Sequence, residues 1–104
     1  MSDKLSIQSS LEGSRAVLTL DGRLGVHSSE DLASEIEKLP DGVRDIDIDF
    51  SHVTYVASAG IRVLLIAAKQ CDDRGGTLRI LHPSEDAVEP FGLASLELVL
   101  NIVP

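Results

Sequence analysis

The segment Asp45–Phe50 alternates without interruption between aspartate and an apolar residue. Because successive side chains of a β-strand point to opposite faces, this pattern predicts a strand with one buried apolar face and one acidic face. We expect this strand to cover residues 43–50 and a loop to follow it. From Ser58 to about Asp73 the apolar residues change to the spacing of a helix, at Ile61, Leu64, Leu65 and Ala68.

The remaining apolar pattern places further strands and helices in alternation. Strands are predicted at residues 5–8, 16–20, 77–81 and 98–103, and helices from Ser28 or Ser29 to Leu39 and from Ser84 onward. The first two strands form a hairpin, and Ser28 or Ser29 is the expected helix N-cap. Strands that alternate with helices pair in parallel through right-handed crossovers. The order β-β-α-β-α-β-α-β therefore predicts a small α/β layer fold.

Composition limits the classes of function. The 104 residues carry a net charge of −8, with 43% hydrophobic and 25% charged residues, which predicts one globular domain over residues 1–104. Nucleic acid and anionic lipid surfaces are excluded as partners, because both are bound through clusters of Lys and Arg. The longest apolar run, Val63–Ala68, is too short to insert into a membrane. A single cysteine, Cys71, suits a reducing cytoplasm, where we expect the protein to be located.

Catalytic and metal-binding motifs are absent from the sequence. His27, His52 and His82 are dispersed, and no phosphate-binding glycine loop or nucleophile elbow is present. The aspartates at 45, 47 and 49, with Asp21, are the candidates for a Mg²⁺-dependent hydrolase or phosphatase. Such an enzyme also needs positive groups around the transferred phosphoryl, which this chain lacks. We therefore expect no enzyme, no cofactor and no metal site, and interpret the aspartates as a solvated strand face or as caps of adjoining loops.

Ser58 begins the helix that follows the aspartate-rich strand, and two interpretations of it are open. As a plain N-cap, its side chain would stabilise the helix by about 1 kcal/mol. As an exposed hydroxyl at a helix N-terminus it could instead accept a phosphate, whose charge the free N–H groups there would partly satisfy. Gly60 is expected to leave the backbone approachable at this point.

The residues around Ser58 resemble the signature of a known family. Its parts are Asp49-Phe50-Ser51, Val53-Thr54-Tyr55 and Ser58–Leu65, with Leu20–Leu24, Gly75-Gly76 and Gly92-Leu93 elsewhere in the chain. This set resembles STAS domains, and especially bacterial anti-sigma factor antagonists, over nearly the whole chain. The resemblance implies a STAS-like fold, in which a mixed, mostly parallel sheet has helices packed mainly on one face.

The resemblance also implies a mechanism of partner switching. An antagonist of this kind binds an anti-sigma factor that is a serine kinase and so frees a sigma factor. Phosphorylation of the antagonist ends the binding, a PP2C-type phosphatase reverses it, and Ser58 falls on the family's phosphorylated serine. The partner-binding residues implied in this sequence are Asp21, Gly25, Ser58, Ala59, Gly60, Arg62 and Val63. A weak homodimer is a further expectation.

Two positions depart from the family's pattern. Many members carry an acid just before the serine and another in the loop after the second strand, where this chain has Ala57 and Gly25. Asp21 and Asp49 are the candidates to replace these acids. The departures favour an alternative, a constitutive STAS adaptor subunit of a transporter or signalling scaffold. The outward face of the Ser58 helix, with Ala59, Val63 and Ile66, is either the surface that a partner covers or part of the core.

Overall fold

The computed structural model describes residues 4–83 and 100–103. In these residues the elements are β1 (Leu5–Glu12), β2 (Arg15–Leu24), α1 (Ser28–Glu37), β3 (Asp45–Val56), α2 (Ser58–Asp73), β4 (Leu78–Leu81) and β5 (Asn101–Val103). The helix predicted from Ser84 lies outside the described residues. The last predicted strand, 98–103, is described from residue 100 onward, and β5 forms its final part.

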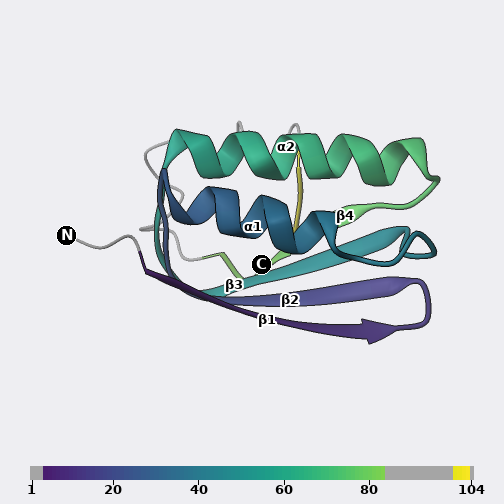
Figure 1. Cartoon of the computed structure of the whole chain (residues 1–104), viewed down its shortest axis with the longest axis horizontal. Coiled ribbons are helices and arrows are strands. Elements are labelled where there is room, and N and C mark those ends of the chain that lie inside the picture. The colour runs from purple at the N-terminus through teal and green to yellow at the C-terminus, as the bar shows by residue number, and fades with distance from the viewer. Residues whose placement is uncertain (1–3, 84–99, 104) are drawn as a thin grey trace.

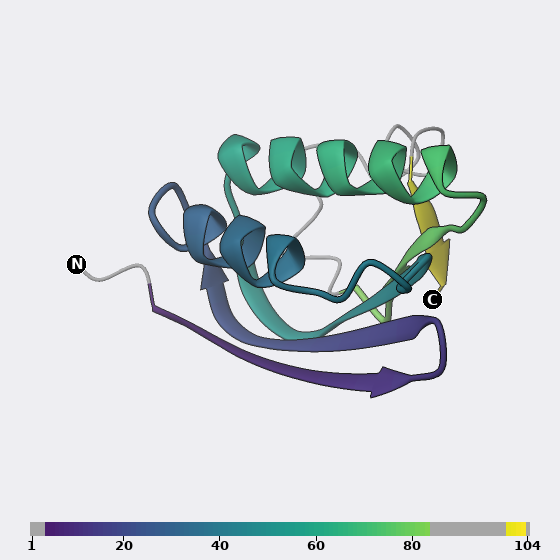
Figure 2. The same cartoon turned by 45° about the vertical axis from the view of Figure 1, so that its right-hand side comes forward.

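The five strands form one sheet in the order β1-β2-β3-β4-β5. β1 pairs antiparallel with β2, and each later pair is parallel. Figures 1 and 2 show α1 and α2 side by side on the same face of this sheet. The predicted fold class, a small α/β domain with a mostly parallel sheet and helices on one face, is confirmed.

The hairpin between β1 and β2 turns at Gly13-Ser14, which lie between the opposed residues Glu12 and Arg15. Gly13 has a φ of 63°. A two-residue hairpin turn needs this left-handed conformation at its first central position, and glycine adopts it without steric strain. The turn therefore sets the register of the whole first pair of strands.

The core lies between the sheet and the two helices and is mainly aliphatic. Its strand residues are Ala16, Leu18, Leu20 and Leu24 of β2, Ile46, Ile48, Phe50, Val53 and Val56 of β3, and Leu78 and Ile80 of β4. The helices add Leu32 of α1 and Leu64, Ala67 and Cys71 of α2, and Val43 and Leu100, just before β3 and β5, complete it. Each large side chain buried in this way contributes about 1.5–3 kcal/mol.

Two sequence expectations about element ends are wrong. β3 does not stop at Phe50 but continues to Val56, because the end of β2 continues to pair with it, from Asp21↔His52 to Leu24↔Val56. Register shifts in this pair interrupt the alternation that marks a strand in the sequence. The strand therefore leads almost directly into α2, with no long loop between them.

The second wrong expectation concerns the start of α1, which has His27 and neither serine as its N-cap. Ser28 and Ser29 are buried in the first turn. Ser28 Oγ accepts a hydrogen bond from Gly25 N–H at 2.8 Å and donates to Arg23 O at 2.7 Å. Ser29 Oγ donates to Val26 O at 2.8 Å. Both hydroxyls therefore fix the loop between β2 and α1.

Candidate functional site at the start of helix α2

The start of α2 is attached to the end of β2. Leu24 and Val56 are the last paired residues of β2 and β3. One residue later, Ala57 N–H donates to Leu24 O at 2.8 Å. Ala57 is still extended, with φ −86° and ψ 162°, and α2 begins at Ser58. The two parallel strands therefore hold the first turn of α2 beside the loop that leads from β2 to α1 (Figure 1).

Ser58 is the first helical residue and its side chain is exposed. The N-cap is Ala57, which makes no side-chain capping bond, so the interpretation of Ser58 as the N-cap is wrong. Among the described residues its hydroxyl has no hydrogen-bond partner. The first turn of α2 also contains no acidic residue. Ser58 thus presents a hydroxyl group to solvent at the positive end of a 16-residue helix.

Gly60 is buried against the side chain of Leu24. A Cβ atom at this position would lie 2.7 Å from Leu24 Cγ and 2.8 Å from Leu24 Cδ2. Leu24 is fully buried, so any shift of its side chain would disturb the core around it. Glycine at this position therefore permits a close approach between α2 and β2, and its backbone is less approachable from outside than the sequence suggested.

The other residues expected to bind a partner lie at different depths. Asp21 and Arg62 are exposed, Ala59 and Val63 are half-buried, and Gly25 is buried. Ile66, on the outward face of α2, is 53% exposed. The outward face of α2 was expected to be either a partner-binding surface or part of the core. Ile66 lies on the surface, whereas Ala59 and Val63 are only partly exposed.

Sequence reasoning missed two exposed apolar residues near the ends of β2 and β3, the strands that hold the Ser58 turn. Val26, in the loop between β2 and α1, is 63% exposed, and Tyr55, near the end of β3, is 41% exposed. The Arg23 guanidinium carbon lies 4.2 Å from the centre of the Tyr55 ring, a cation–π contact. A large apolar residue in a loop next to a glycine, as Val26 is, was a signal available in the sequence.

A shallow groove runs between α1 and α2. Its lining consists of Ala33, Ile36 and Glu37 of α1 and Val63, Ile66, Ala67 and Gln70 of α2. The groove has a volume of about 140 Å³. It extends the apolar surface from the Ser58 turn along α2, and it is too small and too open to enclose a substrate.

The two acids proposed to replace the family's acids lie apart from each other on the sheet. Asp49 pairs with Thr19, seven positions before the end of β3. At about 3.3 Å per residue this is roughly 23 Å along the strand from Val56, so the structure does not bring Asp49 to Ser58. Asp21 lies three positions before the end of β2 and is exposed. Of the two, only Asp21 lies near the end of β2 that carries the Ser58 turn.

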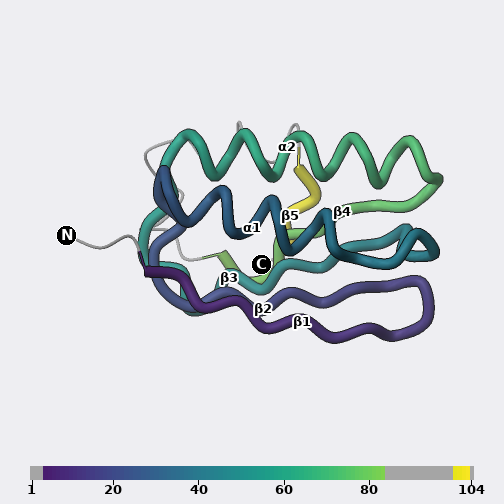
Figure 3. The backbone as a smooth tube through the Cα atoms, viewed as in Figure 1, coloured from purple at the N-terminus to yellow at the C-terminus, as the bar shows by residue number. Residues whose placement is uncertain are grey.

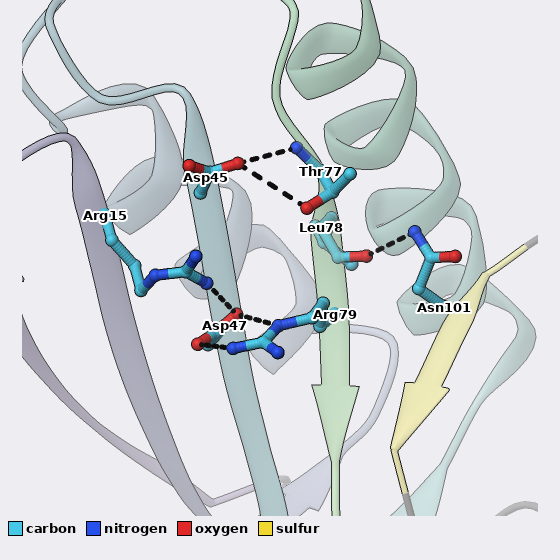
Figure 4. A network of polar contacts seen from close by, with 7 residues as sticks. All are labelled: Arg15, Asp45, Asp47, Thr77, Leu78, Arg79 and Asn101. Atoms are coloured by element: carbon cyan, nitrogen blue, oxygen red, sulfur yellow. Dashed lines mark hydrogen bonds and ion pairs between the residues drawn. The ribbon is translucent and has the colours of Figure 1, made fainter.

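The alternating aspartates of β3 form structural contacts on the sheet face opposite the helices (Figure 4). Asp47, 4% exposed, accepts bonds from Arg79 at 2.8 and 2.7 Å and from Arg15 at 2.9 Å. The hydrogen bonds from Arg79 lower the pKa of Asp47 below its ordinary value. Asp45 accepts from Thr77 N–H at 2.9 Å.

The third aspartate, Asp49, accepts from Ser51 N–H at 2.9 Å, and this backbone bond lowers its pKa. The expectation of a solvated face is therefore wrong for Asp47, whereas Asp45 and Asp49 bond to neighbouring backbone as expected of loop caps. Within residues 4–83 and 100–103, no group of three or more His, Cys, Asp or Glu side chains is placed to hold a metal ion.

Comparisons with known proteins agree with this small sheet-and-helix domain. A family model described as "Mlab, STAS domain" matches residues 7–101. The chain belongs to the STAS domain family, as the resemblance of its sequence implied.

Solved structures share the fold. An anti-sigma factor antagonist from Mycobacterium paratuberculosis has a TM-score of 0.84 at 17% identity, with 100% of this chain and 89% of that chain covered. The Bacillus cell fate determinant SpoIIAA in its phosphorylated form has a TM-score of 0.74 at 20% identity, with 95% and 92% covered. The STAS domain of a SulP transporter from Vibrio cholerae has a TM-score of 0.63 at 18% identity, with 91% and 77% covered. Neither helix in the described part of this chain is long and apolar enough to cross a membrane.

Proposed function

We propose that this protein is an anti-sigma factor antagonist that binds an anti-sigma factor with serine kinase activity and is switched off by phosphorylation of Ser58. The observation that carries the proposal is the exposed hydroxyl of Ser58 at the start of α2, which caps no helix. Two of the similar structures, one an anti-sigma factor antagonist and the other SpoIIAA in phosphorylated form, support it. The bound kinase is the natural source of the phosphate, and a PP2C-type phosphatase would remove it.

The partner-binding surface in this proposal surrounds Ser58. We include in it the exposed apolar side chains of Val26 and Tyr55, near the ends of β2 and β3, and of Ile66 on α2. Gly25 and Gly60 are buried and shape the backbone beneath, while Asp21 and Arg62 supply charge at the rim. A partner that covers this surface removes the Ser58 hydroxyl from water, so a phosphate there would have to be desolvated.

The switch follows from charge. A phosphoserine carries about −1.5 to −2 at neutral pH, added to a chain whose net charge is already −8. In the free protein this charge lies at the positive end of α2 and one helical turn from exposed Arg62. In the complex it would be desolvated or face like charge, an effect of several kcal/mol. Phosphorylation of Ser58 would thus stabilise the free chain and destabilise the complex.

The test is an affinity capture from host extract with two baits, Ser58→Ala and Ser58→Glu, read by mass spectrometry. We expect an anti-sigma factor serine kinase on the Ala bait and its loss from the Glu bait. Ser34→Glu is the matched control, because Ser34 is exposed on α1 and adds the same charge elsewhere. Equal retention of the kinase by all three baits would contradict the switch.

A second candidate function is a constitutive STAS adaptor subunit of a transporter or scaffold. The observation in its favour is that Ala57 and Gly25, which stand in place of acids, are both buried and offer no charge to a kinase. The similar SulP transporter domain also fits this role. In the same capture, a transporter subunit retained by both Ser58 baits, with no phosphate on Ser58 of the native protein, would favour the adaptor.

A further inference from the structure

The outer edge of the sheet is formed by β1, whose one neighbour among the described strands is β2 (Figure 3). β1 is eight residues long and its pairing with β2 contains no register shift. Its sequence, Leu5–Glu12, contains neither proline nor lysine. Natural sheets protect their edges with such residues, with bulges or with very short edge strands. The opposite edge, β5, has three residues, so among the described residues β1 is the unprotected edge.

The hydrogen bonds to β2 determine which backbone groups of β1 point outward. Arg23 N–H donates to Lys4 O at 2.9 Å, so Lys4 belongs to a hydrogen-bonded pair. Because such pairs alternate along antiparallel strands, the even-numbered residues of β1 bond to β2 and the odd-numbered residues point their N–H and C=O groups away from it. These outward residues are Leu5, Ile7, Ser9 and Leu11.

We propose that two copies of this chain pair through β1, antiparallel and about a two-fold axis at Gln8, to form one continuous sheet. A register is possible only where outward residues oppose outward residues. The register that pairs the most outward residues places Gln8 opposite Gln8 of the second copy and Leu5 opposite Leu11. The four outward pairs would then exchange about eight backbone hydrogen bonds, two for each pair.

The side chains are self-complementary in this register. On the open face of the sheet, Lys4 opposes Glu12 of the second copy at both ends of the interface, as an opposite-charge pair. On the helix face, Leu5 opposes Leu11, whose side chain is 52% exposed in the single chain. Pairing would therefore cover the large apolar side chain that β1 leaves in water.

The same edge is separate from the Ser58 surface. Figures 1 and 2 show β1 along the rim of the sheet and α2 across its far side, over the later strands. The proposed dimer therefore does not depend on the proposed function and leaves the start of α2 open to a partner. An eight-residue edge covers less area than a standard stable interface, and each copy carries −8. The dimer is therefore weak and is strengthened by salt.

The first test is sedimentation equilibrium of the full chain over a range of concentrations. We expect Ser9→Pro to weaken self-association by about tenfold or more, because it removes a central outward N–H group from each copy. The N–H of Ser9 does not bond to β2, so the fold is retained, which circular dichroism checks. Ser9→Ala is the matched control and should associate like the original chain. A protein that is monomeric at every concentration, or associates equally in both variants, overturns the proposal.

The second test fixes the register by disulfide formation. Residues at position 8 of the two copies would lie about 4.5 Å apart between Cα atoms, which a disulfide can span. We expect Gln8→Cys to cross-link with itself under mild oxidation. Ser6→Cys and Ser10→Cys should each remain uncross-linked alone and cross-link when mixed. Native Cys71 is buried and does not interfere. Self-linking of Ser6→Cys or Ser10→Cys as efficient as that of Gln8→Cys overturns the register.

Discussion

At the scale of single residues, the polar side chains of Ser58 in α2 and Asp47 in β3 have opposite roles. Ser58 is exposed, and its hydroxyl makes no hydrogen bond among the described residues. Asp47 is buried and bonded to two arginines. The Ser58 hydroxyl is accessible to a reactant because no hydrogen bond among the described residues uses it. The Asp47 carboxylate is not accessible, because its bonds to Arg15 of β2 and Arg79 of β4 connect three neighbouring strands.

Ser58→Glu is predicted to stabilise the folded chain. The first turn of α2 has no acidic residue, so a carboxylate there interacts favourably with the helix dipole, by about 0.3–1 kcal/mol. Arg62, one turn later, adds a few tenths of a kcal/mol. Denaturant unfolding measures the change, and Ser58→Gln serves as the uncharged control. A loss of stability specific to Ser58→Glu would mean that the proposed phosphorylation would act by disturbing the helix and not by surface charge.

Asp47→Asn is predicted to lower stability by about 1–3 kcal/mol at neutral pH, since it weakens charged hydrogen bonds to Arg79 and Arg15. The folded pKa of Asp47 is lowered, so its stabilising effect is complete above the unfolded value near 3.8 and is lost as pH falls below it. The stability difference between the two proteins should therefore shrink as the pH falls from 6 to below 3. A difference that is constant over this range in urea titrations would contradict the role of Asp47.

At the scale of elements, the junction of β2, β3 and α2 determines where Ser58 lies. Ala57 N–H bonds to Leu24 O, and Gly60 packs on the Leu24 side chain. One backbone bond and one close packing contact therefore fix the first turn of α2 against the end of β2.

Gly60→Ala tests this junction. The added methyl group would overlap Leu24, which is fully buried, so α2 must shift or the core must repack. We predict a loss of about 1–3 kcal/mol in unfolding free energy, as for other overpacked cores. Gly42→Ala is a suitable control, because nothing lies within 4 Å of a Cβ at that position. Equal stability of the two variants would show that the Leu24 contact is not tight.

The sequence predicted which segments form strands and helices better than it predicted where these elements end or which polar contacts they make. The apolar spacings of β3 and α2 could be recognised because one face of each is buried, and the helical spacing placed Ser58 at a helix start. The extension of β3 to Val56 was not readable, since it depends on pairing with β2 across register shifts. Asp47 was misread because its partners, Arg15 and Arg79, each lie 32 residues away and meet it only in the sheet.

At the scale of the whole molecule, the single thiol reports on global unfolding. Cys71 is 3% exposed in the core, and burial raises its pKa. We therefore predict that maleimide or disulfide reagents label it slowly in the native protein, at a rate that rises with denaturant in parallel with unfolding. The rate in the unfolded chain is the reference. Rapid native-state labelling that is independent of denaturant would show that the C-terminal half of α2 opens locally.

The contact between Gly60 and Leu24 also bears on how the proposed partner would recognise this protein. Because the turn that carries Ser58 is already held in place in the free chain, little conformational entropy is lost there when a complex forms. A variant that loosens this contact should bind more weakly even though every surface side chain is unchanged. The affinity for the proposed partner would then depend partly on Gly60, a buried residue that the partner does not touch. Its lack of a Cβ atom allows the close packing on Leu24 that holds the turn in place.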